Sequence, residues 1–237
     1  MSELQPLIVY GCGHTPNPWK VVIIIEELGL PYVVEQVDIR TIKDEPYISL
    51  NPNGRLPAFK DPNNNDIVLF ESGAIIDYII EVYDKKALLH YASGPEKHTT
   101  RCWEHFQMSG QGPYFGQKIW FEKFHPQRLP TAIERYLNEM KRVIGVIDSH
   151  LAKKGTDYLV GDKVTYADLM FLPYFAGLPS LVPELDLTKY PQYNAWLGRL
   201  VTRPITSKVL ERYAEAAAEA AASGAVPAVK QVAVVEI

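Results

Sequence analysis

The amino-acid sequence predicts an α/β domain in the first third of the chain and an all-α domain after it. Two observations support this prediction. Residues 1–84 contain a strand, a helix and a strand, followed by a hairpin and a second helix. From residue 97 onward the apolar residues recur at helical spacing, and no further strand is convincing. This change of periodicity predicts two domains.

The first half of the α/β domain is expected to be a βαβ unit. Residues 7–10 form a short apolar run that indicates a buried strand, and the turn GCGHTPNP follows it. Residues 19–28 have helical character, and Gly29 ends the helix. Residues 32–39 are rich in β-branched side chains and indicate a second strand. Two strands joined by one helix pair in parallel.

The second half of this domain is expected to be a hairpin followed by a helix. Residues 57–60 and 67–70 read as strands on either side of DPNNND, a cluster of turn residues. The helix from Ser72 to Tyr83 has isoleucines at helical spacing. The order βαβ then ββα is the thioredoxin-like arrangement.

The periodic pattern breaks between residues 84 and 96, where we expect the boundary between the domains. The helical domain would cover residues 97–222. Residues 223–237 form an apolar tail, which is expected to pack on the protein or a partner or to be disordered. The helices are expected at residues 97–124, 131–153, 165–178, 191–201 and 204–222, the first of them bent by Gly110, Gly112 and Pro113.

A capping box is predicted inside the helical domain. Thr165 and Asp168 have the spacing T-x-x-D before an apolar run, and Val164 can pack against Leu169. We interpret this box as a folding element, so its loss should reduce the stability of the protein and not its chemical activity.

Composition excludes several classes of partner. The formal charge of −4 argues against a nucleic-acid surface, because phosphate binding requires clustered lysine and arginine. No apolar run reaches the roughly 18–20 residues needed to span a bilayer, and no secretory signal is recognisable, so a cytoplasmic protein without a membrane anchor is expected. The two cysteines, Cys12 and Cys102, fit a reducing compartment. Cys12 could be a redox nucleophile, but it has no C-x-x-C partner.

The motif NPNGRLPAF at residues 51–59 contains a proline in an apolar strand-like run. Proline removes a donor from a β-ladder, so Pro57 needs a special reason to be there. In trans it would mark an edge strand or a bulge. In cis the turn could present the Leu56 N–H and C=O groups to the backbone of a ligand.

The motif FESGA at residues 70–74 begins a predicted helix. Ser72 sits where an N-cap is expected, which is one interpretation. The other is that Ser72 and the free N–H groups of the first turn hold a carboxylate while Glu71 pairs with an ammonium group. Together with residues 51–59, the second interpretation predicts a site for a peptide with an α-amino acid head group.

Five sequence blocks resemble a known family. They are HTPNPWKV from His14, NPNGRLPAF from Asn51, WEHFQMSGQGPYFGQ from Trp103, ERYLNEMKRVIGVID from Glu134 and YLVGDKVTYADL from Tyr158. The sequence resembles the glutathione S-transferases over nearly all of residues 5–212, and within them the fungal branch that includes the yeast nitrogen-catabolite regulator. The resemblance implies the glutathione transferase fold, glutathione as co-substrate, a homodimer and no metal.

The resemblance also implies which residues activate the thiol of glutathione. An unperturbed thiol has a pKa of about 8.5, so the protein must stabilise the thiolate near neutral pH. Thr15 falls where several transferase classes place a serine, and Asn17 falls where the fungal branch has an asparagine. Asn17 could instead be a helix cap ahead of Pro18. Tyr10 and His14 are nearby alternatives, as is the cysteine between them.

The same resemblance assigns the remaining contacts to glutathione. Leu56, before Pro57, would contact the cysteinyl backbone, and Glu71 with Ser72 would bind the γ-glutamyl head group. Lys43 would reach the glycyl carboxylate, unless it is simply a solvated loop residue. Arg55 is a further candidate, either for the carboxylates or for the dimer contact.

An acceptor pocket for a small hydrophobic electrophile is expected between the domains, along the bent helix. Small glycines would leave room there, and an aromatic ring could stack on the ligand. The same aromatic residues could equally form the core between the domains. The candidates are Phe106, Gln107, Gly110, Gln111, Tyr114 and Tyr174.

The function expected from the sequence is conjugation of glutathione to an electrophile, in detoxification or secondary metabolism. Two alternatives stay open. One is glutathione-dependent isomerisation or peroxide reduction. The other is a glutathione-binding regulator with little catalysis, although the chain has no Asn/Gln-rich appendage of the kind that would favour it.

Overall fold

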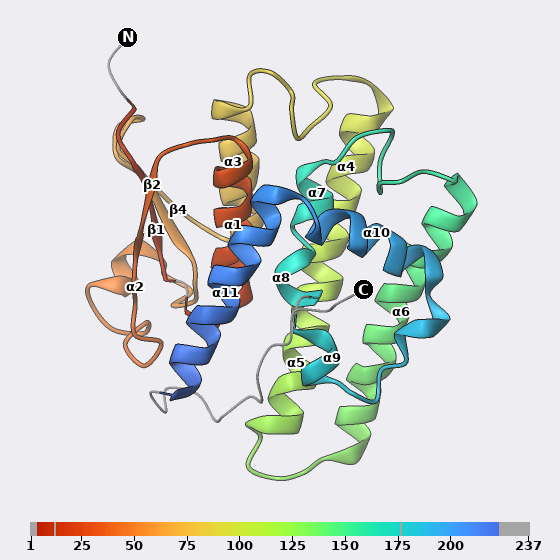
Figure 1. The fold of residues 1–237 in the computed structure, drawn as a ribbon. Coiled ribbons are helices and arrows are strands. Elements are labelled where there is room, and N and C mark those ends of the chain that lie inside the picture. The colour runs from red at the N-terminus through yellow and green to blue at the C-terminus, as the bar shows by residue number, and fades with distance from the viewer. Residues whose placement is uncertain (1–3, 12, 176, 223–237) are drawn as a thin grey trace. The chain divides into compact units, whose positions relative to one another are not determined.

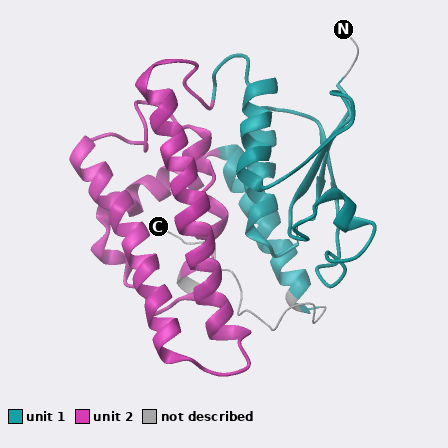
Figure 2. Cartoon of the chain, turned by 180° about the vertical axis from the view of Figure 1, so that it is seen from behind, with its two compact units in different colours: residues 1–88, 204–232 teal, residues 89–203, 233–237 magenta. Residues whose placement is uncertain are grey.

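The structure is a computed structural model that describes residues 4–11, 13–175 and 177–222. Cys12 and the tail at 223–237 lie outside the described residues. Contacts divide the chain into two compact units (Figure 2), with boundaries between Leu88 and Leu89 and between Arg203 and Pro204. Each unit is described by itself.

Unit 1 is built on a four-stranded mixed sheet in the order β2-β1-β3-β4. The parallel pairing of β1 with β2 and the antiparallel pairing of β3 with β1 and β4 confirm the predicted βαβ and ββα arrangement. The second strand ends earlier than expected, at Glu35, because the chain turns at Asp38, whose carbonyl accepts from the Thr41 N–H. The strands are β1 (Leu7–Tyr10), β2 (Tyr32–Glu35), β3 (Ala58–Asp61) and β4 (Ile67–Phe70).

Helices cover both faces of this sheet (Figure 1). Helices α1 (Pro16–Glu27) and α3 (Ser72–Tyr83) pack against each other on one face, over the fully buried side chains of Val9 and Phe59. The short helix α2 (Tyr47–Leu50) lies on the other face and was not predicted. A four-residue helix is too short to show helical periodicity in the sequence.

A buried carboxylate ties the hairpin to α3. Asp61 accepts hydrogen bonds from the hydroxyl groups of Tyr78, at 2.7 Å, and Tyr83, at 2.5 Å, and from the backbone N–H of Asn63. Burial raises the pKa of Asp61, but the hydrogen bonds from Tyr83, Tyr78 and Asn63 outweigh it and hold the pKa below the ordinary value. Asp61 is therefore ionised in the folded protein at neutral pH.

The last described helix, α11 (Pro204–Ala222), belongs to unit 1 by its contacts, although the sequence places these residues with the helical domain. It packs against α1. Arg212 pairs with Glu26 at 2.7 Å, and the Thr206 hydroxyl donates to Glu27 at 3.2 Å. The apolar pattern of a helix shows that one face is covered, but not by which domain.

Unit 2 is helical, as predicted. The expected bent helix is α4 (Gly94–Phe106), a π-helical turn (Gln107–Gln111) and α5 (Gly112–Lys123), so the irregularity lies at the predicted glycines. The expected helix at 165–178 is broken into short pieces, with Pro173 in the first turn of the second piece. The other helices are α6 (Pro130–Lys154), α7 (Tyr166–Leu169), α8 (Leu172–Phe175), α9 (Leu178–Leu181), the 3-10 helix at Leu187–Lys189 and α10 (Pro191–Val201).

The predicted capping box begins α7. The Asp168 carboxylate is fully buried and accepts from the Thr165 backbone N–H and hydroxyl, both at 2.8 Å. It also accepts from the Leu159 N–H and the Trp196 indole N–H, both at 2.9 Å. One carboxylate therefore joins α7, the preceding loop and α10. Within the described residues, no helix is both long enough and apolar enough to cross a membrane.

Candidate functional site

Strand register brings the ends of three segments together at one edge of the unit 1 sheet. Tyr10 pairs with Ala58, and Ala58 pairs with Phe70. The residues that flank this row are Gly11 after β1, Pro57 before β3 and Glu71 after β4. A Cβ atom on Gly11 would lie 2.5 Å from Leu56 Cδ2, so the turn after β1 touches the loop before β3. The two predicted motifs are therefore neighbours in space.

The loop at 51–57 is held by two buried side chains, Asn51 and Tyr47. Asn51 is 2% exposed, and its Nδ2 donates to the carbonyl oxygens of Arg55, at 2.7 Å, and Pro57, at 3.4 Å. Its Oδ1 accepts from the Asn53 N–H at 3.0 Å, and the Tyr47 hydroxyl also donates to the Arg55 carbonyl, at 2.7 Å. The Leu56–Pro57 bond inside this loop is cis, which is one of the two alternatives left open by the sequence.

The junction between β4 and α3 has an unusual backbone. Glu71 is the N-cap of α3 and has φ 67 and ψ 114, a left-handed conformation that is uncommon for a residue with a side chain. Ser72 is the first helical residue and is 2% exposed, so the prediction that Ser72 is the cap was wrong by one position. The Glu71 side chain is exposed and lies 3.4 Å from the amide of Asn53. The junction thus combines a carboxylate, a buried hydroxyl and the N–H groups of a first helical turn.

The start of α1 carries both candidates for thiol activation. Thr15 is the N-cap and Pro16 is the first helical residue, so Asn17 lies inside the first turn. The alternative that Asn17 caps the helix ahead of Pro18 is therefore wrong. Both Thr15 and Asn17 are half-buried at the positive end of the helix dipole.

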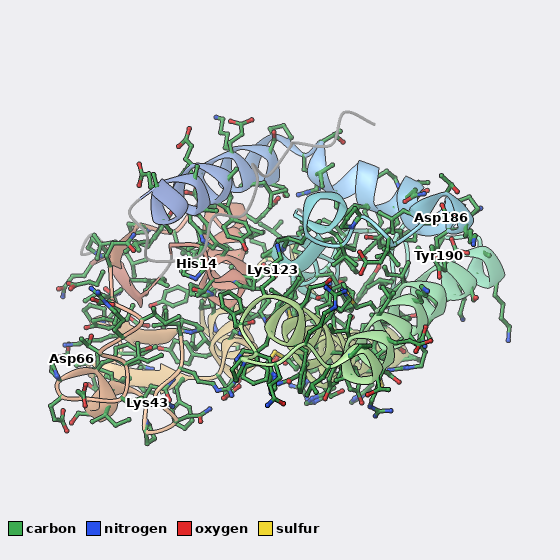
Figure 3. The ribbon with its side chains drawn as sticks, turned by 90° about the horizontal axis from the view of Figure 1, so that it is seen from below. His14, Lys43, Asp66, Lys123, Asp186 and Tyr190 are labelled. Atoms are coloured by element: carbon green, nitrogen blue, oxygen red, sulfur yellow. The ribbon has the colours of Figure 1, made fainter. Side chains whose placement is uncertain are left out.

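His14 lies beside the start of α1 (Figure 3). Burial lowers the pKa of His14 below its ordinary value, so the imidazole is neutral at pH 7 and supplies no fixed positive charge. Positive potential at this point comes from the first turn of α1 instead.

Two basic residues lie on the loops around the sheet edge. Lys43 is at the outer edge of unit 1 (Figure 3), and its Nζ donates to the carbonyl of Asn53 at 2.8 Å. The structure therefore joins Lys43 to the loop that carries Leu56. Arg55 has an exposed side chain on the same loop, and its carbonyl is the acceptor for Asn51 and Tyr47 described above.

Sequence reasoning missed three residues that shape this site: Asn51, Asn53 and Tyr47. Asn51 is the first residue of the motif NPNGRLPAF. The sequence signal that could have identified Asn51 is its residue type, because asparagine side chains commonly hydrogen-bond to nearby backbone groups in turns. Tyr47 could not have been found, because its partner at Arg55 depends on the fold of α2.

The two glutamines proposed for the acceptor pocket are interior residues of unit 2. Gln107 and Gln111 are both fully buried. The Gln107 amide donates to Gln111 Oε1 at 2.8 Å, and the Gln111 amide donates to the Phe171 carbonyl at 3.1 Å. Because each amide group has a partner inside the unit, these side chains hold the π-helical turn to the core.

The other four candidates have neighbours in α6 or next to Gly112. The Arg142 guanidinium of α6 lies 5.9 Å from the Phe106 ring centroid and 6.0 Å from that of Tyr114. A Cβ atom on Gly110 would lie 3.7 Å from Phe106 and from Val143 Cγ2 of α6, which is ordinary van der Waals contact, so Gly110 lies against both side chains.

Tyr174 lies next to Gly112, since its hydroxyl would be 3.5 Å from a Cβ atom there. The assignment of these residues to an acceptor pocket stays a prediction.

No group of three histidine, cysteine, aspartate or glutamate residues that could hold a metal ion is present among the described residues.

Comparison with known proteins gives consistent matches. The family model for the N-terminal domain of glutathione S-transferases matches residues 5–81, and the model for the C-terminal domain matches residues 113–204. The glutathione S-transferase-like protein OpS6 of Beauveria bassiana is 50% identical over 211 residues, covering 88% of this chain and 96% of that protein.

A solved structure and a more distant sequence relative are also similar to most of this chain. The crystal structure of the glutathione transferase URE2P6 from Phanerochaete chrysosporium, in complex with oxidized glutathione, has a TM-score of 0.85 and 42% identity, covering 92% of this chain and 100% of that chain. The transcriptional regulator URE2 of Saccharomyces cerevisiae is 30% identical over 244 residues, covering 88% of this chain and 69% of that protein.

Proposed function

Because the chain belongs to the glutathione S-transferase family, we propose that it is a glutathione-dependent transferase. Glutathione is the co-substrate, and its thiolate attacks a small hydrophobic electrophile. The sulfur forms a bond to the electrophilic carbon, and either a leaving group departs with its electron pair or, on addition to a double bond, a proton reaches the neighbouring carbon.

The proposal rests on the arrangement at the sheet edge, where the loop before β3 and the junction between β4 and α3 lie next to each other. Glutathione has an α-amino acid head group, a cysteinyl backbone and a terminal carboxylate, and unit 1 offers a matching group for each. The exposed Glu71 carboxylate complements the ammonium, and the Ser72 hydroxyl with the first turn of α3 complements the head-group carboxylate. Leu56, before Pro57, offers its backbone to the cysteinyl part.

The glycyl carboxylate would lie toward the two basic residues. Lys43 is the first candidate because its Nζ donates to the Asn53 carbonyl of the 51–57 loop at 2.8 Å. Arg55 is exposed on the same loop and could add a second positive charge.

Thiol activation is assigned to the first turn of α1, with Asn17 as the donor and Thr15 as the alternative. Asn17→Ala should raise the pKa of the bound thiol more than Thr15→Ala, since the threonine hydroxyl shares its rotamer choice with a methyl group. Ultraviolet titration of the bound thiolate measures both shifts. The reverse ranking would make Thr15 the activator.

The electrophile is proposed to contact aromatic side chains such as Phe106, Tyr114 and Tyr174. The test of function is a screen of the pure protein for conjugation, peroxide reduction and double-bond isomerisation in the presence of glutathione. Conjugation supports the transferase, and activity in either of the other assays alone supports the isomerase or peroxidase alternative. A role in detoxification or secondary metabolism in the cytoplasm is part of the proposal.

The second candidate is a glutathione-binding regulator with little catalysis, and the similarity to the transcriptional regulator URE2 favours it. The two functions share the glutathione-binding site. They differ in whether the protein lowers the pKa of the bound thiol. Glutathione binding with an unshifted thiol pKa and no activity in the screen would support the regulator.

A homodimer is also proposed. The support is the family, which pairs helices α3 and α4 across a two-fold axis. Light scattering should give about twice the chain mass of 26.8 kDa. A mass equal to one chain at micromolar concentration would contradict the dimer.

A further inference from the structure

The C-terminal helix α11 reaches the turn that precedes α1. The Tyr213 hydroxyl donates to the carbonyl oxygen of His14 at 3.2 Å. The Tyr213 ring also packs on Trp19 of α1, with ring centroids 5.4 Å apart, and the Trp19 indole N–H donates to the carbonyl of Gly13 at 2.8 Å. Two side chains in contact with each other therefore hold two consecutive carbonyl groups.

These two hydrogen bonds constrain the conformation of the turn. A peptide group is planar, so holding its oxygen also orients the N–H group of the following residue. Trp19 orients the peptide between Gly13 and His14, and Tyr213 orients the peptide between His14 and Thr15. Together, the two hydrogen bonds fix the direction in which the chain enters α1 at its N-cap, Thr15.

Helix α11 is anchored independently of this turn. At the far end of α1, the buried Thr206 hydroxyl donates to Glu27 at 3.2 Å. Arg212 pairs with Glu26 at 2.7 Å. Loss of the Tyr213 hydroxyl should therefore leave α11 in place on α1 while releasing one constraint on the turn.

We propose that Tyr213 is a positioning residue for thiol activation. It acts through the His14–Thr15 peptide on the first turn of α1, where Thr15 and Asn17 lie. The proposal rests on the proposed function, since it assumes that the glutathione thiol is held there. Stabilisation by a helix N-terminus falls off within the first turn, so a small displacement of this turn changes the thiol pKa. Binding of the head group at Glu71 and Ser72 should not change.

The test compares two isosteric changes that each remove one hydroxyl between the same two helices. Tyr213→Phe removes the bond to the turn, and Thr206→Val, the matched control, removes the bond at the other end of α1. The measurements are the glutathione Kd by calorimetry, the pKa of the bound thiol by ultraviolet titration, and kcat with the electrophile found in the screen. Hydrogen exchange of the peptide containing residues 13–17 reports the turn directly.

Tyr213→Phe should raise the thiol pKa, lower kcat at neutral pH about two- to fivefold, and leave the Kd within about twofold. The expected effect is modest because 3.2 Å is long for a hydroxyl donor. Exchange at residues 13–17 should be faster in Tyr213→Phe than in Thr206→Val, and Thr206→Val should keep the wild-type thiol pKa.

Three results would overturn the proposal. One is an unchanged thiol pKa and unchanged exchange in Tyr213→Phe. Another is an equal effect of Thr206→Val, which would indicate a general loss of helix packing. If the wild-type protein does not bind glutathione, the proposed function itself fails, and calorimetry on the wild type separates that outcome from the other two.

Discussion

Replacing Asn51 should weaken glutathione binding without unfolding the protein. The change Asn51→Ala removes two hydrogen bonds of ordinary length, to the Arg55 carbonyl at 2.7 Å and from the Asn53 N–H at 3.0 Å, and a weaker one to Pro57. Each ordinary bond contributes about 0.5–1.5 kcal/mol. The Arg55 carbonyl keeps its bond from Tyr47, so it is not left without a partner. We therefore expect a loss of about 1–3 kcal/mol in the free energy of unfolding.

The effect on the ligand follows from the same loop. If the loop must be reordered when glutathione binds, a cost of about 1.4 kcal/mol raises the Kd tenfold. Calorimetry gives the Kd, and urea unfolding gives the stability of the same samples. Asn51→Asp refines the test, because a carboxylate can still accept from Asn53 but cannot donate to Arg55. This variant should bind glutathione at least as weakly as Asn51→Ala.

The control is Asn138→Ala, since Asn138 is an exposed asparagine on α6 in unit 2. It should leave both measurements unchanged. A folded Asn51→Ala protein with a Kd within twofold of wild type would refute the reasoning that Asn51 holds the binding loop.

Three further predictions concern single residues. Ser72→Ala should weaken glutathione binding by about 1–3 kcal/mol by calorimetry while the protein stays folded, and unchanged affinity would remove Ser72 from the site. Asp168→Ala leaves four buried donors without their acceptor, so chemical unfolding should show a loss of at least about 3 kcal/mol, whereas a loss under about 1 kcal/mol would contradict the structural role. Because the folded pKa of Asp61 lies below its ordinary value of 3.8, its contribution to stability is complete above about pH 4 and is lost as the pH falls through the folded pKa. The difference in melting temperature between wild type and Asp61→Asn should accordingly shrink below pH 4, and a constant difference from pH 7 to pH 3 would oppose this.

Much of unit 1 could be predicted because its signals are local. The strands at Leu7–Tyr10 and Ile67–Phe70 and the helix at Ser72–Tyr83 have the predicted bounds. Helix α1 begins at Pro16, three residues before the predicted start. The prolines of GCGHTPNP favour a turn by sequence, but proline is also well tolerated in the first turn of a helix, where the structure places Pro16 and Pro18.

The candidate site was predicted in its residue types but not in its arrangement. Glu71, Ser72 and Leu56 were identified from two motifs, and the register of β1, β3 and β4 brings those motifs side by side. In unit 2, periodicity marked Gln107 and Gln111 as members of a helix, but it could not show that their amide groups bond inside the unit.

The sequence by itself determined the order of the elements, the family resemblance and the capping box, because these depend on residues within one or two turns of each other. Tertiary structure alone decided that α11 joins unit 1 and that Tyr213 meets the turn at His14. The physical reason is that the local signals identify a face that must be covered, whereas the covering partner, here about two hundred residues away, is selected by the packing free energy of the whole chain.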